Sequence, residues 1–209
     1  MGILATLVIL FSGNGTVGIV VVPVGAMFVL LWARLSRTPW REIGYVRPRS
    51  WIGGLAIGLV FGSTFKLLMK AIVMPLVGAS AINQTYHYLA GNRALLPAAI
   101  AAMLVAGFGE ETVFRGYLFE RLGKLLGSSA GAKVAIVVIT TVLFGLAHYP
   151  DQGWPGVEQA LGTGLVFGAI FAMTGRLWML MCAHAAFDLT ALAIIYWNLE
   201  SDVAHWVFK

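Results

Sequence analysis

Two adjacent carboxylates and one arginine interrupt an otherwise apolar stretch of the sequence. Residues 95–108 carry no charge, and Glu110, Glu111 and Arg115 come soon after them. Glu111 and Arg115 are four residues apart, so on a helix they share a face and can form an ion pair. That pair would leave Glu110, about 100° further round the helix, as a carboxylate without a local cation. A carboxylate of this kind is a candidate general base.

Two histidines lie in similar pairs further along the chain. In FGLAH, Phe144 precedes His148 by four residues, and in HAAFD, His184 precedes Asp188 by four. Residues at this spacing lie on one helix face, so Asp188 could orient the imidazole of His184 or share a ligand with it. Phe144 is expected to be a packing residue.

These groups suit hydrolysis of an amide by either of two routes. Two histidines and a carboxylate could bind Zn²⁺ or another divalent metal and leave one coordination position open for water. Without a metal, a glutamate would take a proton from water, a histidine would hold that water, and the other groups would stabilise the oxyanion. No HExxH motif is present, so the geometry of the familiar soluble zinc proteases is absent. Spacing alone leaves both routes open.

The composition indicates that these residues lie in a membrane. The chain has 209 residues, of which 59% are hydrophobic and 11% charged, whereas soluble domains carry about 25% charged residues. The net charge of +5 is concentrated in five arginines between Arg34 and Arg49, as expected for a loop on the cytoplasmic side. No basic helix with a DNA-reading pattern is present, so we expect the bilayer, and no nucleic acid, as a partner.

Hydropathy predicts an all-α, polytopic helical bundle, because a helix needs about 20 apolar residues to cross the bilayer. We expect one membrane-embedded domain over residues 1–209, with about six spans after a short N-terminal helix. The expected spans are 16–33, 51–76, 95–121, 132–148, 159–173 and 177–197, and a polar tail follows from 198.

The second span carries glycines and lysines at regular spacing. Gly54, Gly58 and Gly62 are four residues apart, and small residues at this spacing let helix backbones approach closely. Lys66 and Lys70 follow in the same span and are expected to snorkel toward the interface. Binding of an acidic group or a C-terminal carboxylate by these lysines is an alternative.

The expected depths of these residues in the membrane support a common site. At 1.5 Å per residue, Glu110 lies roughly 16–20 Å from Arg121 and Lys124, and His148 roughly 22 Å from Lys133. By the same rise, His184 and Asp188 lie roughly 12 and 18 Å from Arg176. All four groups are therefore expected near the middle of the membrane, where they could converge in one cavity.

Three motifs in order resemble one protein family. EETVFR (110–115) resembles the EExxxR motif of the CAAX protease and bacteriocin-processing (CPBP, also called Abi) family, FGLAH its FxxxH motif, and HAAFD its HxxxN or HxxxD motif. TPWREIGYVRP (38–48) is similar to the loop that precedes the family's core. The resemblance covers roughly 40–192, with a motif-bearing core at about 93–197. It implies an all-helical intramembrane endopeptidase with the type II CAAX prenyl endopeptidase fold.

The resemblance also implies roles for individual residues. Glu110 is expected to be the general base, and His148 to help activate the water. His184 and Asp188 would stabilise the oxyanion, or bind a metal together with Glu110 and His148 if a metal is used. Supporting roles are expected for three residues, Glu111, Arg115 and Phe144.

One position departs from the usual pattern of the prenyl-protease branch. That branch usually has Asn where this chain has Asp188. An Asn amide can donate a hydrogen bond to an oxyanion, whereas an ionised Asp cannot. Asp188 would then be protonated, orient His184, or bind a cation.

The expected setting is a prokaryotic cytoplasmic membrane, with the active-site cavity facing the cytosol. The expected substrates are membrane-associated, either CAAX-type prenylated protein tails or peptide leaders. Two alternatives remain open. The first is a non-proteolytic immunity or scaffold protein of the same family, and the second is a proton or ion carrier, since intramembrane Glu and His can relay protons.

Overall fold

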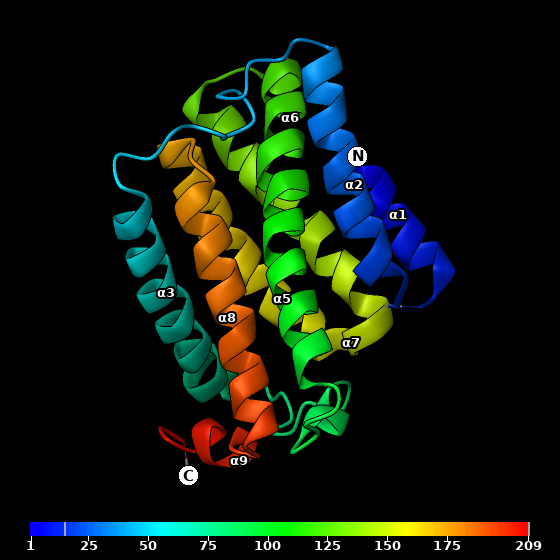
Figure 1. Ribbon diagram of the computed structural model, residues 1–209, viewed down its shortest axis with the longest axis vertical. Coiled ribbons are helices and arrows are strands. Elements are labelled where there is room, and N and C mark those ends of the chain that lie inside the picture. Colours follow the sequence, from blue (N-terminus) through cyan, green and yellow to red (C-terminus); the bar gives the residue numbers. More distant parts are fainter. Residues whose placement is uncertain (15, 209) are drawn as a thin grey trace.

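The computed structural model of the protein describes residues 1–14 and 16–208. In this part of the chain every regular element is a helix (Figure 1). The elements are α1 (Gly2–Ser12), α2 (Thr16–Leu35), α3 (Trp51–Leu68), η1 (Met69–Val73), α4 (Met74–Leu76), η2 (His87–Leu89), α5 (Leu96–Glu110), η3 (Glu111–Tyr117), α6 (Leu118–Leu126), α7 (Ala130–Thr174), α8 (Trp178–Tyr196) and α9 (Glu200–Ala204). The predicted all-α bundle is therefore confirmed.

Several elements join into longer continuous helices. Five helices among the described residues are long and apolar enough to cross a membrane: Val17–Leu35, Trp51–Leu76, Leu96–Leu126, Ala130–Thr174 and Trp178–Tyr196. Large apolar side chains on their outer faces are exposed, for example Met27, Ile57 and Val138. Such a surface suits lipid rather than water.

The fourth long helix, α7, is two antiparallel arms and not one rod. Gly153 has a non-helical conformation with φ 60° and ψ −157°, a region that favours glycine. On either side of it, a Cβ added at Gly164 would lie 3.1 Å from Thr141, and one at Gly168 would lie 3.3 Å from Val137. Residues before the break therefore pack against residues after it. With α7 counted as two spans, the predicted total of about six is reached, and both arms extend beyond their predicted ends.

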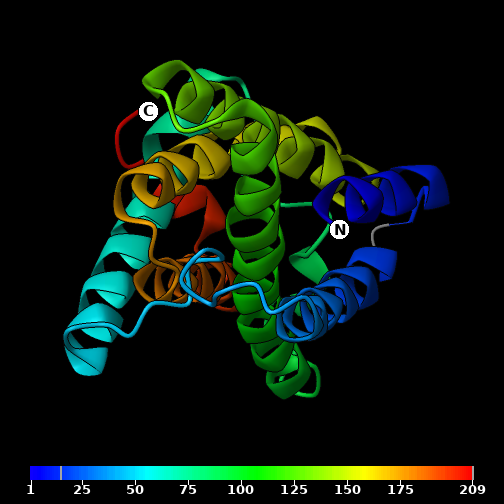
Figure 2. The ribbon, with the colours of Figure 1, turned by 90° about the horizontal axis from the view of Figure 1, so that it is seen from above.

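A central helix runs through the bundle. Figures 1 and 2 show α5 and α6 in the middle, with α1 and α2 on one side and α3 and α8 on the other. The arms of α7 pack against α1, α6 and η3. This arrangement surrounds η3 and the end of α5 with helices.

The glycines of α3 bring it against α8, as predicted. A Cβ added at Gly62 would lie 2.0 Å from the backbone oxygen of Ala183, and one at Gly58 would lie 2.8 Å from that of Met179. No side chain fits at either position, so the two backbones are in direct contact. The contact runs up to the residue before His184.

One expectation for a polar residue was wrong, and one polar segment is more ordered than expected. Lys66 does not snorkel, because it is only 6% exposed and its Nζ donates to Gln159 Oε1 at 2.6 Å. The polar tail after 198 includes α9, which places Glu200 in the interior with 1% exposure. Glu200 accepts hydrogen bonds from the Asn83 backbone N–H at 2.7 Å and from His87 Nδ1 at 2.8 Å.

The loop before α5 also holds the turn of the α7 hairpin. Tyr86 Oη donates to Asp151 Oδ2 at 2.6 Å, and Thr85 Oγ1 donates to the Asp151 carbonyl at 3.1 Å. Burial, followed by the hydrogen bond and the charge of Asp151, raises the pKa of Tyr86 above its ordinary value. Tyr86 therefore keeps its proton and remains a hydrogen-bond donor.

Candidate active site

The helix that carries both glutamates changes from α-helical to π-helical between them. η3 is a π-helical segment that begins at Glu111, directly after the α-helical Glu110. Such insertions within α-helices are rare and are frequent at functional sites. Small residues let this region pack tightly: a Cβ at Gly107 would lie 2.8 Å from the Ala185 backbone nitrogen, and one at Gly116 would lie 3.0 Å from the Ile43 carbonyl oxygen.

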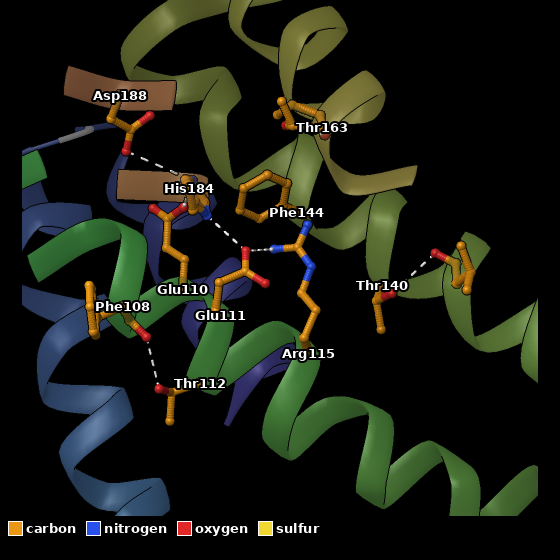
Figure 3. Close-up of polar contacts among 12 residues, drawn as sticks. Phe108, Glu110, Glu111, Thr112, Arg115, Thr140, Phe144, Thr163, His184 and Asp188 are labelled. Atoms are coloured by element: carbon orange, nitrogen blue, oxygen red, sulfur yellow. Dashed lines mark hydrogen bonds and ion pairs between the residues drawn. The ribbon is translucent and has the colours of Figure 1, made fainter. Parts of the chain in front are cut away.

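Glu111 is the centre of a buried polar cluster (Figure 3). Its side chain is fully buried, and its Oε1 accepts from Arg115 Nη1 at 2.9 Å and from His184 Nδ1 at 2.7 Å. The predicted Glu111–Arg115 pair is therefore confirmed. Its other oxygen, Oε2, is buried without a hydrogen-bond partner. Because a carboxylate only accepts, the Nδ1 of His184 is the donor and its Nε2 faces away from Glu111.

Arg115 lies between two aromatic rings. It is 1% exposed, and its guanidinium carbon lies 4.5 Å from the ring centroid of Phe144 and 5.9 Å from that of Phe167. A desolvated cation at this distance from a ring face is stabilised by the ring quadrupole. Phe144 thus does more than fill space, because it covers the cation that neutralises Glu111.

Glu110 and Asp188 converge on the other nitrogen of His184. Glu110 Oε2 lies 3.4 Å from His184 Nε2, and Asp188 Oδ2 lies 3.8 Å from the same atom. The side chains of Glu110 and Asp188 are 16% and 21% exposed, in contrast to the buried Glu111. Figure 3 shows Glu110 and Asp188 on the side of the His184 ring opposite Glu111.

His148 reaches the same region through Phe144. Its Nδ1 lies 2.8 Å from the Phe144 carbonyl oxygen, which can only accept, so Nδ1 donates. The Nε2 of a neutral ring then has a free lone pair. The ring centroid of Phe144 lies 4.7 Å from that of His148 and 5.9 Å from that of His184. Both histidines therefore contact one aromatic ring.

Two features of the site could not be read from the motifs. Glu111, and not Asp188, makes the short hydrogen bond that orients His184, and this contact joins residues on different helices. Phe167, on the second arm of α7, packs against Arg115 and against the His184 ring at 5.5 Å. No motif includes Phe167, and its spacing to the other residues carries no signal.

Glu110, His148, His184 and Asp188 were expected to bind a metal if one is used. Among residues 1–14 and 16–208, no three His, Cys, Asp or Glu side chains are placed so that they could hold a metal ion. The Nδ1 atoms of both histidines are engaged in hydrogen bonds, which is how metal-binding histidines are usually oriented. In this arrangement the described side chains form no three-ligand group, and the metal route remains a prediction.

One protein family matches the part of the chain that holds these residues. Residues 92–190 match the family described as type II CAAX prenyl endopeptidase Rce1-like. This segment is an Rce1-like domain. It includes Glu110, Glu111, His148, His184 and Asp188, so the family resemblance predicted from the motifs is confirmed for this segment. The match supports a function of the CAAX-type intramembrane protease kind. No curated protein and no solved structure matches the chain.

Proposed function

We propose that the protein is an intramembrane endopeptidase in which Glu110 is the general base. The observation that carries this proposal is the different setting of the two adjacent glutamates. Glu111 is buried and bonded to Arg115 and His184, whereas Glu110 is partly exposed beside His184 Nε2 at 3.4 Å. Of the two glutamates, Glu110 has the setting that supports proton exchange with a water molecule.

In the proposed reaction, Glu110 takes one proton from a water molecule held by His148. The remaining hydroxide oxygen bonds to the carbonyl carbon of the substrate, and the carbonyl oxygen becomes an oxyanion. When His184 carries a proton on Nε2, that N–H can donate to the oxyanion. The tetrahedral intermediate then breaks its C–N bond, and Glu110 returns its proton to the leaving amine.

Asp188 is proposed to act on His184 rather than on the oxyanion. Its Oδ2 lies 3.8 Å from His184 Nε2, within the range of an ion pair but beyond a hydrogen bond. An ionised carboxylate at this position cannot donate to an oxyanion, but it favours a proton on Nε2. Glu111 and Arg115 hold the ring from the other side.

The proposed substrates are peptides of membrane-associated proteins, either CAAX-type prenylated tails or peptide leaders. We further propose that the protein lies in a prokaryotic cytoplasmic membrane, with its cavity open to the cytosol. A charged peptide end could then approach from water while an attached lipid stays in the bilayer.

Cleavage of a peptide panel tests this function. Prenylated and unprenylated peptides are incubated with the purified parent and with Glu110→Ala in detergent, and the products are identified by mass. We expect cleavage by the parent and a loss of at least about 100-fold in the variant, as for removal of a general base. The matched control is Asp202→Ala, which removes an exposed carboxylate on α9 and should cleave like the parent.

Two other outcomes would overturn the proposal. Equal cleavage by Glu110→Ala and the parent would exclude Glu110 as the base. No cleavage of any peptide by the parent, together with a cellular phenotype that survives Glu110→Ala, would favour the immunity or scaffold alternative.

A further inference from the structure

A hydrogen bond connects the 36–50 loop to the π-helical segment of the candidate site. Tyr45 Oη lies 2.8 Å from Thr112 Oγ1, and Thr112 is the second residue of η3. Thr112 Oγ1 also donates to the Phe108 carbonyl oxygen at 2.8 Å (Figure 3). Because a carbonyl oxygen only accepts, that bond uses the single hydroxyl proton of Thr112, and Tyr45 must donate to Thr112. A chain of two hydrogen bonds therefore runs from the loop to the helix.

The two residues before Tyr45 fix the backbone from which its side chain extends. Ile43 is fully buried. Gly44 has φ 81°, and a Cβ added there would lie 2.6 Å from the ring of Phe171, so both the conformation and the space require glycine. The Gly44 carbonyl accepts from the Leu177 N–H at 3.0 Å. Tyr45 therefore approaches η3 from a segment that is packed and bonded on its own account.

The setting of the two hydroxyl groups favours this hydrogen bond. Tyr45 as a whole is 36% exposed, but its hydroxyl lies against Thr112, which is only 2% exposed. Burial raises the pKa of Tyr45 above its ordinary value, so the phenol keeps its proton and remains a donor. Loss of the Tyr45 hydroxyl would leave a buried oxygen of Thr112 without its donor, and water could replace that donor only poorly.

The winding of η3 determines how the two glutamates are turned relative to each other. Glu110 is the last α-helical residue and Glu111 the first π-helical one. A π-helix bonds residues five apart, whereas an α-helix bonds residues four apart. Rewinding η3 as an α-helix would therefore rotate the residues on one side of it relative to those on the other. Thr112 follows both glutamates directly, so a contact that holds Thr112 also holds their orientation toward His184.

We propose that Tyr45 is a positioning residue for Glu110 and Glu111, and that it acts through Thr112 on the π-helical winding of η3. The inference rests on the proposed endopeptidase function and adds a residue that lies outside all three motifs. The 36–50 loop then has a second task besides joining α2 to α3, because it holds the helix that carries the proposed base.

Variants that remove single hydroxyl groups test the inference by steady-state cleavage. Tyr45→Phe and Thr112→Val should each lower kcat about 2- to 10-fold, the range for one neutral hydrogen bond, with little change in KM. Thr112→Ser keeps the hydroxyl and should retain the kcat of the parent. Tyr45→Phe combined with Thr112→Val should lose no more than either alone, because both remove one contact. Tyr88→Phe, which changes an exposed tyrosine in η2, is the control. An unchanged kcat in Tyr45→Phe, or losses that add in the double variant, would overturn the inference.

Chemical labelling separates failure of this inference from failure of the proposed function. Dicyclohexylcarbodiimide modifies carboxyl groups in apolar surroundings, and mass spectrometry of fragments gives the label on each glutamate. The parent and Tyr88→Phe should be labelled at Glu110 and not at Glu111, which is fully buried. Tyr45→Phe should shift label from Glu110 to Glu111. Such a shift supports the inference even if the parent cleaves no peptide. An unchanged pattern in Tyr45→Phe overturns it, and cleavage by the parent would still support the peptidase.

Discussion

At the level of single residues, two neighbouring glutamates have opposite environments. Glu111 is closed in by Arg115, His184 and the ring of Phe144, while Glu110 remains partly exposed. Removing one partner of a buried ion pair leaves an uncompensated charge, which is strongly destabilising. The two side chains should therefore affect different properties of the protein.

We predict that Glu111→Gln lowers stability and that Glu110→Gln does not. Glu111→Gln leaves Arg115 buried without its counter-charge, and the expected loss is about 3–5 kcal/mol of unfolding free energy. Glu110→Gln should lose activity while its unfolding midpoint stays near that of the parent. Thermal unfolding in detergent measures both variants, and equal midpoints for the two would contradict the separation of roles.

We predict that Asp188→Asn is tolerated better than His184→Gln. Asp188 makes no short hydrogen bond to His184, at 3.8 Å, and an Asn amide can donate to the oxyanion itself. His184→Gln removes the ring that Glu111 orients. Steady-state cleavage should fall within about tenfold for the first variant and at least about 100-fold for the second. The reverse order would assign the oxyanion contact to Asp188.

Metal removal distinguishes the two hydrolytic routes. Because the described site holds no group of three suitable ligands, we predict that the parent retains activity after dialysis against a chelator. Activity that is lost and then restored by Zn²⁺ would instead assign a metal to Glu110, His148, His184 and Asp188. Metal content measured on the same samples is the control.

At the level of elements, backbone contacts set the position of His184. α3 meets α8 through Gly58 and Gly62, and α5 meets α8 through Gly107, whose Cβ would lie 2.8 Å from the Ala185 nitrogen. These two contacts hold α8 from both sides near His184. The imidazole can then lie between carboxylates from a neighbouring helix without any loop contributing to its position.

We predict that Gly62→Ala disturbs the site although it adds only one methyl group. The added carbon would lie 2.0 Å from the Ala183 oxygen, so α3 and α8 must separate, and overpacking of this kind costs about 1–3 kcal/mol. Gly123→Ala is the control, because no atom lies within 4 Å of its added carbon. A lower unfolding midpoint and slower cleavage are expected for the first variant alone. Equal behaviour of both variants would show that the close contact does not position His184.

The sequence predicted the elements better than the contacts between them. Hydropathy located the spans, and four-residue spacing predicted both the Glu111–Arg115 pair and the close approach of α3. The Glu111–His184 hydrogen bond and the position of Phe167 depend on how α5, α7 and α8 pack, which local periodicity does not encode. The burial of Lys66 was missed for the same reason. It depends on a hydrogen bond to Gln159, a residue on another helix.

At the level of the whole molecule, the basic loops gather at one end of the bundle (Figure 1). Lys124 Nζ pairs with Glu42 at 3.1 Å, and the Leu177 N–H donates to the Gly44 carbonyl at 3.0 Å. The loop of 36–50 is thus joined to the end of α6 and to the turn before α8. Clustering of basic residues at one end favours a cytosolic position for that end.

We predict that Ser36 faces the cytosol and Ser80 the opposite side. Both serines are exposed, in loops at opposite ends of the bundle. Each is changed to cysteine in a Cys182→Ala background, and intact cells are treated with a membrane-impermeant maleimide. Ser80→Cys should react at once, and Ser36→Cys only after the cells are opened. The opposite pattern would invert the proposed orientation.

Because the site is divided among three helices, it can form only when the last of them has been synthesised. Glu110 is on α5, His148 on the first arm of α7, and His184 on α8, so the ribosome makes the proposed base long before the ring that lies beside it. Until α8 enters the membrane, Glu111 lacks one of its two bonded partners and Glu110 has no imidazole beside it. The proposed activity therefore begins only after α8 has been synthesised and inserted, and an unfinished chain cannot cut its neighbours during its own biogenesis.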